Sequence, residues 1–315
     1  MPTSLRCLLV SCLWVLAACG PQSPDAALNS FQPAQIDTGD RVRIFTSASA
    51  AGVAFFANIG QTAVDPHGTC PSVVINANVT TYTGGCTTTA GVMYLGTLTV
   101  THDPMNDSYE SRFTDYGTQQ LRSCTPGGAS AMSLMETQTF TGLVRSGNLH
   151  AFHGSFHVEL RGEGDVPDTH CVLTHGVRAL VYDGTWSQNG ADANNDGIPD
   201  HAIWNGSGRM GDSVNGVVHA QTSDETIERP VCNSEALSGT TQLQAGAHAA
   251  IITYDGSSDC TPDSTVTWTY DAAPQGSLSG VACSVSHGAR GSRAVLVLGL
   301  AGALAAALRR RRRTR

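Results

Sequence analysis

Residues 92–101 read V-M-Y-L-G-T-L-T-V-T, a stretch in which apolar and polar side chains alternate. One face would carry Val92, Tyr94, Leu98 and Val100, and the other Met93, Thr97, Thr99 and Thr101. A period of two is that of a β-strand with one face on a core, because successive side chains point to opposite sides. This stretch therefore predicts a half-buried strand.

The same period recurs along the chain and sets the fold class. Residues 73–80, 152–160 and 266–270 also alternate. The second of these stretches would place Phe152, Phe156, Val158 and Leu160 on one face and His153, Ser155, His157 and Glu159 on the other. No long stretch has helical periodicity. The sequence predicts an all-β body of antiparallel strands, arranged as a meander, a sandwich or an irregular barrel and stapled by disulfides.

Short glycine-containing motifs predict where strands end. Gly84-Gly85 stand just before Cys86, and the tripeptide Tyr-Asp-Gly follows an apolar run at 182–184 and again at 254–256. Asp-Gly suits the tight turn of a hairpin. We therefore expect a hairpin turn at each of these tripeptides.

The polar face of residues 153–159 carries two histidines and a glutamate, which raises the question of a metal site. His153 and His157 would stand about 13 Å apart on one strand, too far to share an ion. His157 and Glu159 would be about 7 Å apart at the backbone, so further ligands would have to come from neighbouring strands. A solvated polar face is the favoured interpretation.

Charge is distributed unevenly and excludes several kinds of function. All 26 acidic residues lie between Asp25 and Asp271, where only nine arginines oppose them, and the chain has no lysine. Such an acidic body is not expected to bind nucleic acid, which needs a basic face. The absence of lysine excludes P-loop phosphate binding, Schiff-base chemistry and Ser-Lys hydrolysis.

The ten cysteines fall into three groups by position. Cys7, Cys12 and Cys19 are N-terminal, and Cys283 opens the C-terminal tail. The body holds the other six, Cys70, Cys86, Cys124, Cys171, Cys232 and Cys260. Six cysteines in an exported protein predict three disulfides, and the absence of any C-x2-C pair argues against zinc. Cys70 and Cys86 are the expected first pair, worth about 3 kcal/mol of stability; the pairing of the other four is open.

The N-terminus carries an export signal. Arg6 is followed by an apolar run over 7–17 that ends in Leu16-Ala17-Ala18-Cys19-Gly20. This ending resembles the lipobox of bacterial lipoproteins, which implies cleavage before Cys19 and attachment of lipid to its sulfur. Residues 1–18 would then be the signal peptide, and the polar residues 19–40 a flexible tether. An ordinary secretory signal is the alternative.

The C-terminus carries a second membrane-directed segment. Cys283-Ser284 precede an apolar stretch, Ala294 to Leu308, and a basic run, Arg309 to Arg313. The arrangement resembles the MYXO-CTERM sorting tail of myxobacterial surface proteins, which implies that residues 283–315 are recognised and removed during surface display. A permanent C-terminal anchor is the alternative, with the arginines in the cytoplasm.

One motif in the body predicts a metal ion. Residues 192–200 read D-A-N-N-D-G-I-P-D and resemble the calcium loops of thrombospondin type 3 repeats. The expected ligands are Asp192, Asn194, Asp196, Asp200 and the main-chain carbonyl of Ile198. Ile203 stands where an EF-hand has its bidentate glutamate, so the affinity should be modest, about 0.1–1 mM. An Asx-Gly turn without an ion is the alternative.

No catalytic pattern is evident. The chain has no H-E-x-x-H and no G-x-S-x-G, and Gly211-Asp212-Ser213 is expected to be a loop rather than an esterase nucleophile block. Residues 41–282 would form a β ectodomain with a candidate seam near 186–204. We expect a non-enzymatic lipoprotein of the outer membrane or cell surface, with a structural or adhesive role.

Its partners would be the membrane, through the lipid and the tail, and envelope polysaccharide or surface proteins. One alternative function is a secreted glycan hydrolase that uses two carboxylates. The other is a glycan-binding module that uses Trp186 and Trp204 as exposed aromatic platforms.

Overall fold

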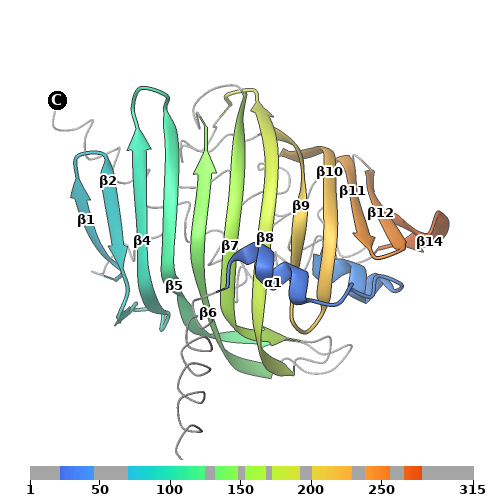
Figure 1. Ribbon diagram of the computed structural model, residues 1–315, viewed down its shortest axis with the longest axis horizontal. Helices are drawn as coiled ribbons and strands as arrows, with labels where there is room; N and C mark the ends of the chain where they lie inside the picture. Colours follow the sequence, from blue (N-terminus) through green and yellow to red (C-terminus); the bar gives the residue numbers. More distant parts are fainter. Residues whose placement is uncertain are drawn as a thin grey trace, which may run out of the picture.

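The described part of the chain forms one antiparallel sheet. The computed structural model describes residues 22–45, 70–124, 132–147, 153–167, 172–191, 201–228, 238–255 and 266–278. Successive strands lie side by side in chain order, so the arrangement is an open meander rather than a sandwich or a closed barrel (Figure 1). The predicted all-β class with antiparallel strands is confirmed.

The strands lengthen toward the middle of the sheet. Their bounds are β1 (Ser72–Asn76), β2 (Val79–Thr83), β3 (Cys86–Thr87), β4 (Met93–Asp103), β5 (Ser108–Cys124), β6 (Met132–Ser146), β7 (His153–Pro167), β8 (Leu173–Gln188), β9 (His201–Asp212), β10 (Gly216–Glu228), β11 (Ser238–Ala245), β12 (His248–Asp255), β13 (Thr267–Tyr270) and β14 (Ala273–Ser277). The short β3 pairs only with β4 and lies off the main path. β1 and β14 are the two edges.

One face of the sheet, called here the core face, is apolar across nearly all the strands. Tyr94, Leu98 and Val100 on β4 and Val158 and Leu160 on β7 are all buried there, as the period-two pattern predicts. The alternation continues at the other end of the sheet, where Trp268 is also buried. The core therefore follows directly from the local period of the sequence.

The first predicted strand is in fact two strands. Residues 73–80 were expected to run straight, but Ala77 has φ of 50° and the chain reverses there. β1 and β2 form a hairpin in which Asn76 faces Val79. The alternation hid the turn because neither Ala77 nor Asn78 is a glycine or a proline.

The expected turn at 182–184 is wrong. Tyr182, Asp183 and Gly184 lie in the middle of β8, which continues to Gln188. Gly184 has a packing role instead, because a Cβ at this position would lie 2.4 Å from the Cζ atom of Phe156. The ring of Phe156 on β7 occupies the space where a side chain would stand.

The segment predicted as a flexible tether is packed on the sheet over its described residues. Helix α1 (Pro24–Ser30) crosses the face opposite the core, here called the outer face, over β7 to β9 (Figure 1). Ser23 caps it by accepting a hydrogen bond from the amide of Ala26. Ala27 and Leu28 are buried against an apolar patch that includes Val177, Ala179 and Val181 of β8.

The chain after α1 passes alongside the sheet and joins the core. Val217 of β10 donates its amide proton to the carbonyl of Gln32, and Ala34 donates to the carbonyl of Val217. Ile36, Val42 and Phe45 then lie in the same apolar cluster as the core face. Residues 31–45 thus belong to the folded body, and the expectation that residues up to 40 form a flexible tether is wrong for its described part.

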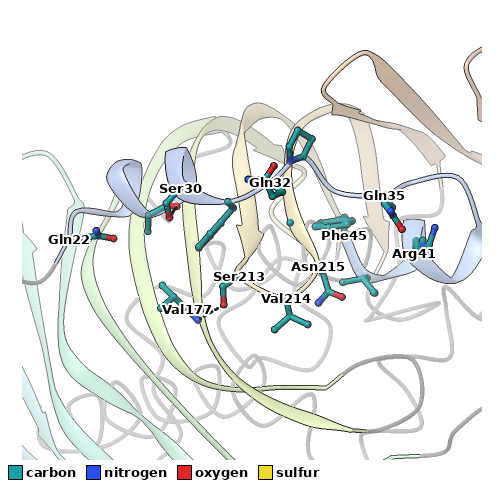
Figure 2. A pocket seen from close by; sticks show the side chains of 15 residues that line it. Gln22, Ser30, Gln32, Gln35, Arg41, Phe45, Val177, Ser213, Val214 and Asn215 are labelled. Atoms are coloured by element: carbon teal, nitrogen blue, oxygen red, sulfur yellow. Dashed lines mark hydrogen bonds between the residues drawn. The ribbon is translucent and has the colours of Figure 1, made fainter.

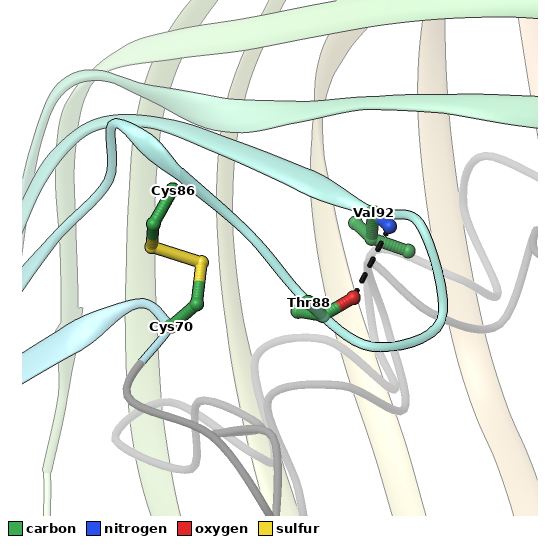
Figure 3. Close-up of a disulfide and its surroundings, with 4 residues drawn as sticks. All are labelled: Cys70, Cys86, Thr88 and Val92. Carbon is green, nitrogen blue, oxygen red and sulfur yellow. Dashed lines mark hydrogen bonds between the residues drawn. A yellow bond between two sulfur atoms is a disulfide. The ribbon is translucent and has the colours of Figure 1, made fainter.

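A disulfide staples the first strands, as predicted. Cys70 and Cys86 are bonded, and they join the start of β1 to β3 (Figure 3). The β1–β2 hairpin lies between them, rather than the single strand that the sequence suggested. Cys124 is the last residue of β5. Cys19, Cys171, Cys232, Cys260 and Cys283 lie outside the described residues.

The sheet is continuous at the expected seam. β8 and β9 pair along eleven positions, from Arg178 opposite Asp212 to Gln188 opposite Ala202. The described residues on both sides of 192–200 therefore belong to one sheet. Among the residues with described structure, no helix is long and apolar enough to span a membrane.

Candidate functional site

A cavity of about 740 Å³ lies between the N-terminal segment and the β9–β10 turn (Figure 2). Its apolar lining comes from Ala27, Phe31, Pro33, Ile44, Phe45, Val177 and Val214, and its polar lining from Gln22, Ser30, Gln32, Gln35, Arg41, Ser213 and Asn215, with Gly216 as the remaining residue. Apolar and polar side chains thus line the cavity in equal number.

A hydrogen-bonded turn between β9 and β10 forms one wall of the cavity. Asp212 accepts hydrogen bonds from the amides of Val214 and Asn215, at 2.8 and 2.6 Å, and so shapes the turn. Ser213 accepts a bond from the amide of Val177 at 3.0 Å. Gly211 and Asp212 are the last residues of β9, so the loop expected at Gly211-Asp212-Ser213 begins only at Ser213.

The other wall carries the cavity's cationic group. Arg41 donates to Asp37, four residues earlier in the chain, at 2.6 Å, and this bond holds the pKa of the Asp37 carboxyl below its usual value. Both side chains remain nearly half exposed, so the pair adds little to stability. The Arg41 guanidinium therefore gives this wall of the cavity a positively charged group but contributes little to the stability of the fold.

A second hollow, here called the outer groove, crosses β6 to β10 on the outer face. It has a volume of about 620 Å³, and most of the side chains that line it are polar. The polar side chains that line it on this face are those of Arg145, Ser155, His157, Asp183, Thr185, Asn205, Ser207, Gln221 and Ser223. Their hydroxyl, amide and charged groups could form hydrogen bonds with a polar, extended ligand such as a polysaccharide.

His157 occupies the outer groove with two carboxylates beside it. Its Nδ1 atom lies 2.8 Å from an oxygen of Asp183 across the β7–β8 pair, and its Nε2 atom lies 4.0 Å from Glu159. Where the structure describes the chain, no group of three histidine, cysteine or acidic side chains is placed to hold a metal ion. The polar face is hydrogen-bonded across strands.

A buried polar cluster lies on the core face under β8 to β12. The Tyr182 hydroxyl donates to Thr222 at 2.7 Å, and the Thr241 hydroxyl donates to a carboxyl oxygen of Glu225. The Tyr254 hydroxyl lies 3.4 Å from that of Thr241. Glu225 is fully buried, and its second carboxyl oxygen has no hydrogen-bond partner among the residues that the structure describes.

Burial controls the protonation of this cluster. Removal from water raises the pKa of Glu225 to about 7, and the bond from Thr241 offsets only part of that effect. Burial likewise raises the pKa of Tyr182 to about 12. Near neutral pH the Glu225 carboxyl is therefore poised between its neutral and charged forms.

Two tryptophans lie near this cluster and are not exposed platforms. Trp186 and Trp204 face each other across β8 and β9, with exposed fractions of 6% and 2%. Glu225 stands opposite Trp204 in the β9–β10 register. The expectation of exposed glycan-binding aromatics is wrong, because both rings point into the core.

The predicted calcium ligands Asp192, Asn194, Asp196, Ile198 and Asp200 lie outside the described residues. The structure instead draws attention to Glu225, which the sequence does not single out. Glu225 is missed because the pairing of β9 with β10 shifts register between Thr222 and Glu225, where Asp224 has φ of 50°. Within β10 no glycine or proline marks that shift, although Gly239 of β11 packs against the backbone of Asp224.

Comparisons with known proteins give no relative for this chain. No protein family model, no curated protein and no solved structure matches it.

Proposed function

We propose that this chain is a non-enzymatic lipoprotein of the cell envelope, with a structural or adhesive role, whose β-sheet is held close to the membrane. The observation that supports closeness is the position of α1. Only four residues separate Cys19, the proposed lipid attachment site, from Pro24, where the helix starts. Fully extended, the five Cα–Cα steps from Cys19 to Pro24 span about 17 Å.

Contacts between α1 and the sheet fix the end of this short segment to the folded body. Arg209 of β9 donates to Asp25 and, at 2.7 Å, to Asn29, which joins the helix to the sheet beneath it. Ala27 and Leu28 are buried as well, so the sheet would stay close to a lipid attached to Cys19. The membrane would then be the first partner, and the outer membrane or cell surface the location.

Loss of fatty-acid labelling in Cys19→Ala is the expected result that tests this proposal. Cells that express the full chain would be grown with an alkyne-bearing fatty acid, and the purified protein would be assayed for the label. Cys12→Ala is the matched control and should label like the wild type, because residue 12 would leave with the signal peptide. Equal labelling of Cys19→Ala and wild type would refute the lipid site.

The C-terminal segment 283–315 fits the same proposal as a sorting tail. Its resemblance to MYXO-CTERM tails suggests that it is removed during surface display, in which case the lipid on Cys19 is the lasting anchor. The basic run Arg309 to Arg313 would set its orientation before removal.

The loop 192–200 is proposed to bind calcium as a structural staple. It connects β8, which ends at Gln188, to β9, which begins at His201, and these strands are antiparallel neighbours. Three carboxylates in nine residues repel one another, and an ion of charge +2 would remove that repulsion.

Calcium is expected to raise the melting temperature by a few degrees. At ten times Kd the gain in stability is about 1.4 kcal/mol. Asp196→Ala should abolish the gain and leave the metal-free melt nearly unchanged, and magnesium should substitute poorly. A wild-type melt that does not respond to millimolar calcium would reduce the loop to a turn.

Envelope polysaccharide is a second candidate partner, favoured by the polar lining of the outer groove. Arg145→Ala and Gln221→Ala should weaken co-sedimentation of the protein with isolated envelope polysaccharide. Thr99→Ala, on the same face of β4, should have no effect. If all three variants bind as well as the wild type, the groove is not the polysaccharide site. Turnover of the polymer would overturn the non-enzymatic assignment.

A further inference from the structure

The edge strand β1 exposes an unusual run of apolar side chains. Val73, Val74 and Ile75 are 36%, 61% and 63% exposed, and every residue of β1 is exposed. β1 pairs with β2 on one side and, among the described residues, with no strand on the other. Three successive β-branched residues at an open edge form a template for another strand.

The hairpin turn determines which main-chain groups point to the open side. Asn76 and Val79 face each other across the two-residue turn, and the pair that closes such a turn is a hydrogen-bonded one. Because hydrogen-bonded positions alternate along an antiparallel strand, the amides and carbonyls of Val73 and Ile75 point away from β2. The open edge thus offers two donors and two acceptors that a neighbouring strand could use.

Nothing along this edge repels an identical strand. Residues 72–83 contain no charged side chain and no proline. If two β1 strands run antiparallel about a two-fold axis at Val74, Val73 of one copy faces Ile75 of the other. The outward amides and carbonyls then meet in hydrogen-bonded pairs, and the two Val74 side chains face each other at a close, non-hydrogen-bonded position.

The opposite edge of the sheet is protected. β14 contains Pro274, which has no amide proton to donate, and Gly276, whose φ is 90°. A register shift between Trp268 and Thr269 also interrupts its pairing with β13. Strand addition at the β14 edge is therefore disfavoured, which leaves β1 as the edge at which another strand can pair.

We propose that two copies of this chain pair through β1 in a closed, two-fold symmetric dimer whose sheet runs continuously from one copy into the other. The self-complementary edge supplies the interface, and the protected β14 edge limits assembly to two copies. The proposal does not depend on lipid attachment.

A single cysteine at the two-fold axis tests this pairing. In the full chain, Val74→Cys should give a disulfide-linked dimer under mild oxidation, because Cα atoms of such facing positions lie about 4.5 Å apart. Gln275→Cys, on the β14 edge, is the matched control and should stay at the monomer level of the wild type on a non-reducing gel.

A second change separates pairing from random collision. Adding Ile75→Pro to Val74→Cys removes the outward amide but leaves the bonds to β2, so the cross-linked dimer should largely disappear while the circular dichroism spectrum stays the same. Adding Ile75→Val should preserve the dimer. The proposal is overturned if Val74→Cys cross-links no more than Gln275→Cys, if Ile75→Pro leaves the dimer intact, or if larger oligomers form.

Discussion

Replacing Glu225 by glutamine is expected to raise the free energy of unfolding by about 3 kcal/mol at pH 8 and to change it little at pH 4. Glutamine resembles the neutral carboxyl in shape and can still accept the hydrogen bond from Thr241. The variant therefore keeps the buried contacts and removes the charge. Denaturant unfolding at both pH values measures the effect.

The sign follows from the raised pKa. The pKa of Glu225 is about 7 in the folded protein, against 4.5 for the ordinary group. Between these values the folded state holds the proton more tightly than the unfolded state, so wild-type stability falls as the pH rises from about 4.5 to about 7. Above that range the folded protein carries a buried charge, which glutamine avoids.

Glu110→Gln is the matched control for this experiment. Hydrogen bonds from Arg145 and Arg112 lower the pKa of Glu110, so its contribution is present at neutral pH and is lost as the pH falls through the lowered pKa. Glu110→Gln should thus destabilise the protein slightly at pH 8. If Glu225→Gln also lowers stability at pH 8, the carboxyl is not buried in the manner described.

Loss of the Cys70–Cys86 disulfide is expected to lower the free energy of unfolding by about 3 kcal/mol. The bond closes a loop that contains β1 and β2, two short strands at the edge of the sheet. Since few other contacts hold an edge hairpin, Cys70→Ser with Cys86→Ser should also increase amide exchange in β2 more than in β8.

The two single replacements provide the control. Cys70→Ser and Cys86→Ser should each destabilise at least as much as the double replacement, because each also leaves a free thiol that can exchange with other cysteines. Under reducing conditions the wild type should approach the double variant in stability. A double variant as stable as the oxidised wild type would show that the bond is not a staple.

The sequence is a good guide to this fold where structure is locally determined. Val100, Leu160 and Trp268 were placed on the core face by their period alone, and the structure buries all three. The pairing of Cys70 with Cys86 also followed from their short separation. The sequence left meander, sandwich and barrel open, because the order of strands depends on turns rather than on period.

Features that depend on distant contacts could not be predicted. Ser23 and Pro24 are good helix-start residues, but α1 is only seven residues long and is held by burial on β8, to which no local pattern points. Glu225 looks solvated in sequence, since Thr222 faces the core and strict alternation would turn residue 225 outward. The register shift after Thr222 reverses that alternation.

The outer groove and the N-terminal cavity were missed for the same reason. Each is assembled from strands or loops that are far apart in the sequence, such as Arg41 with Asn215, or Arg145 with Gln221. Single residues in these sites have no distinguishing pattern of their own. Only the register of the long strands and the path of residues 31–45 bring them together.

The mass of the N-terminal peptide of the mature protein tests the proposed function most directly. Trypsin cleaves after Arg41, and the chain has no lysine or arginine between Cys19 and that residue. The account predicts a peptide that begins at Cys19, ends at Arg41 and carries the added mass of covalently bound lipid. A peptide that begins elsewhere, or an unmodified Cys19, would contradict it.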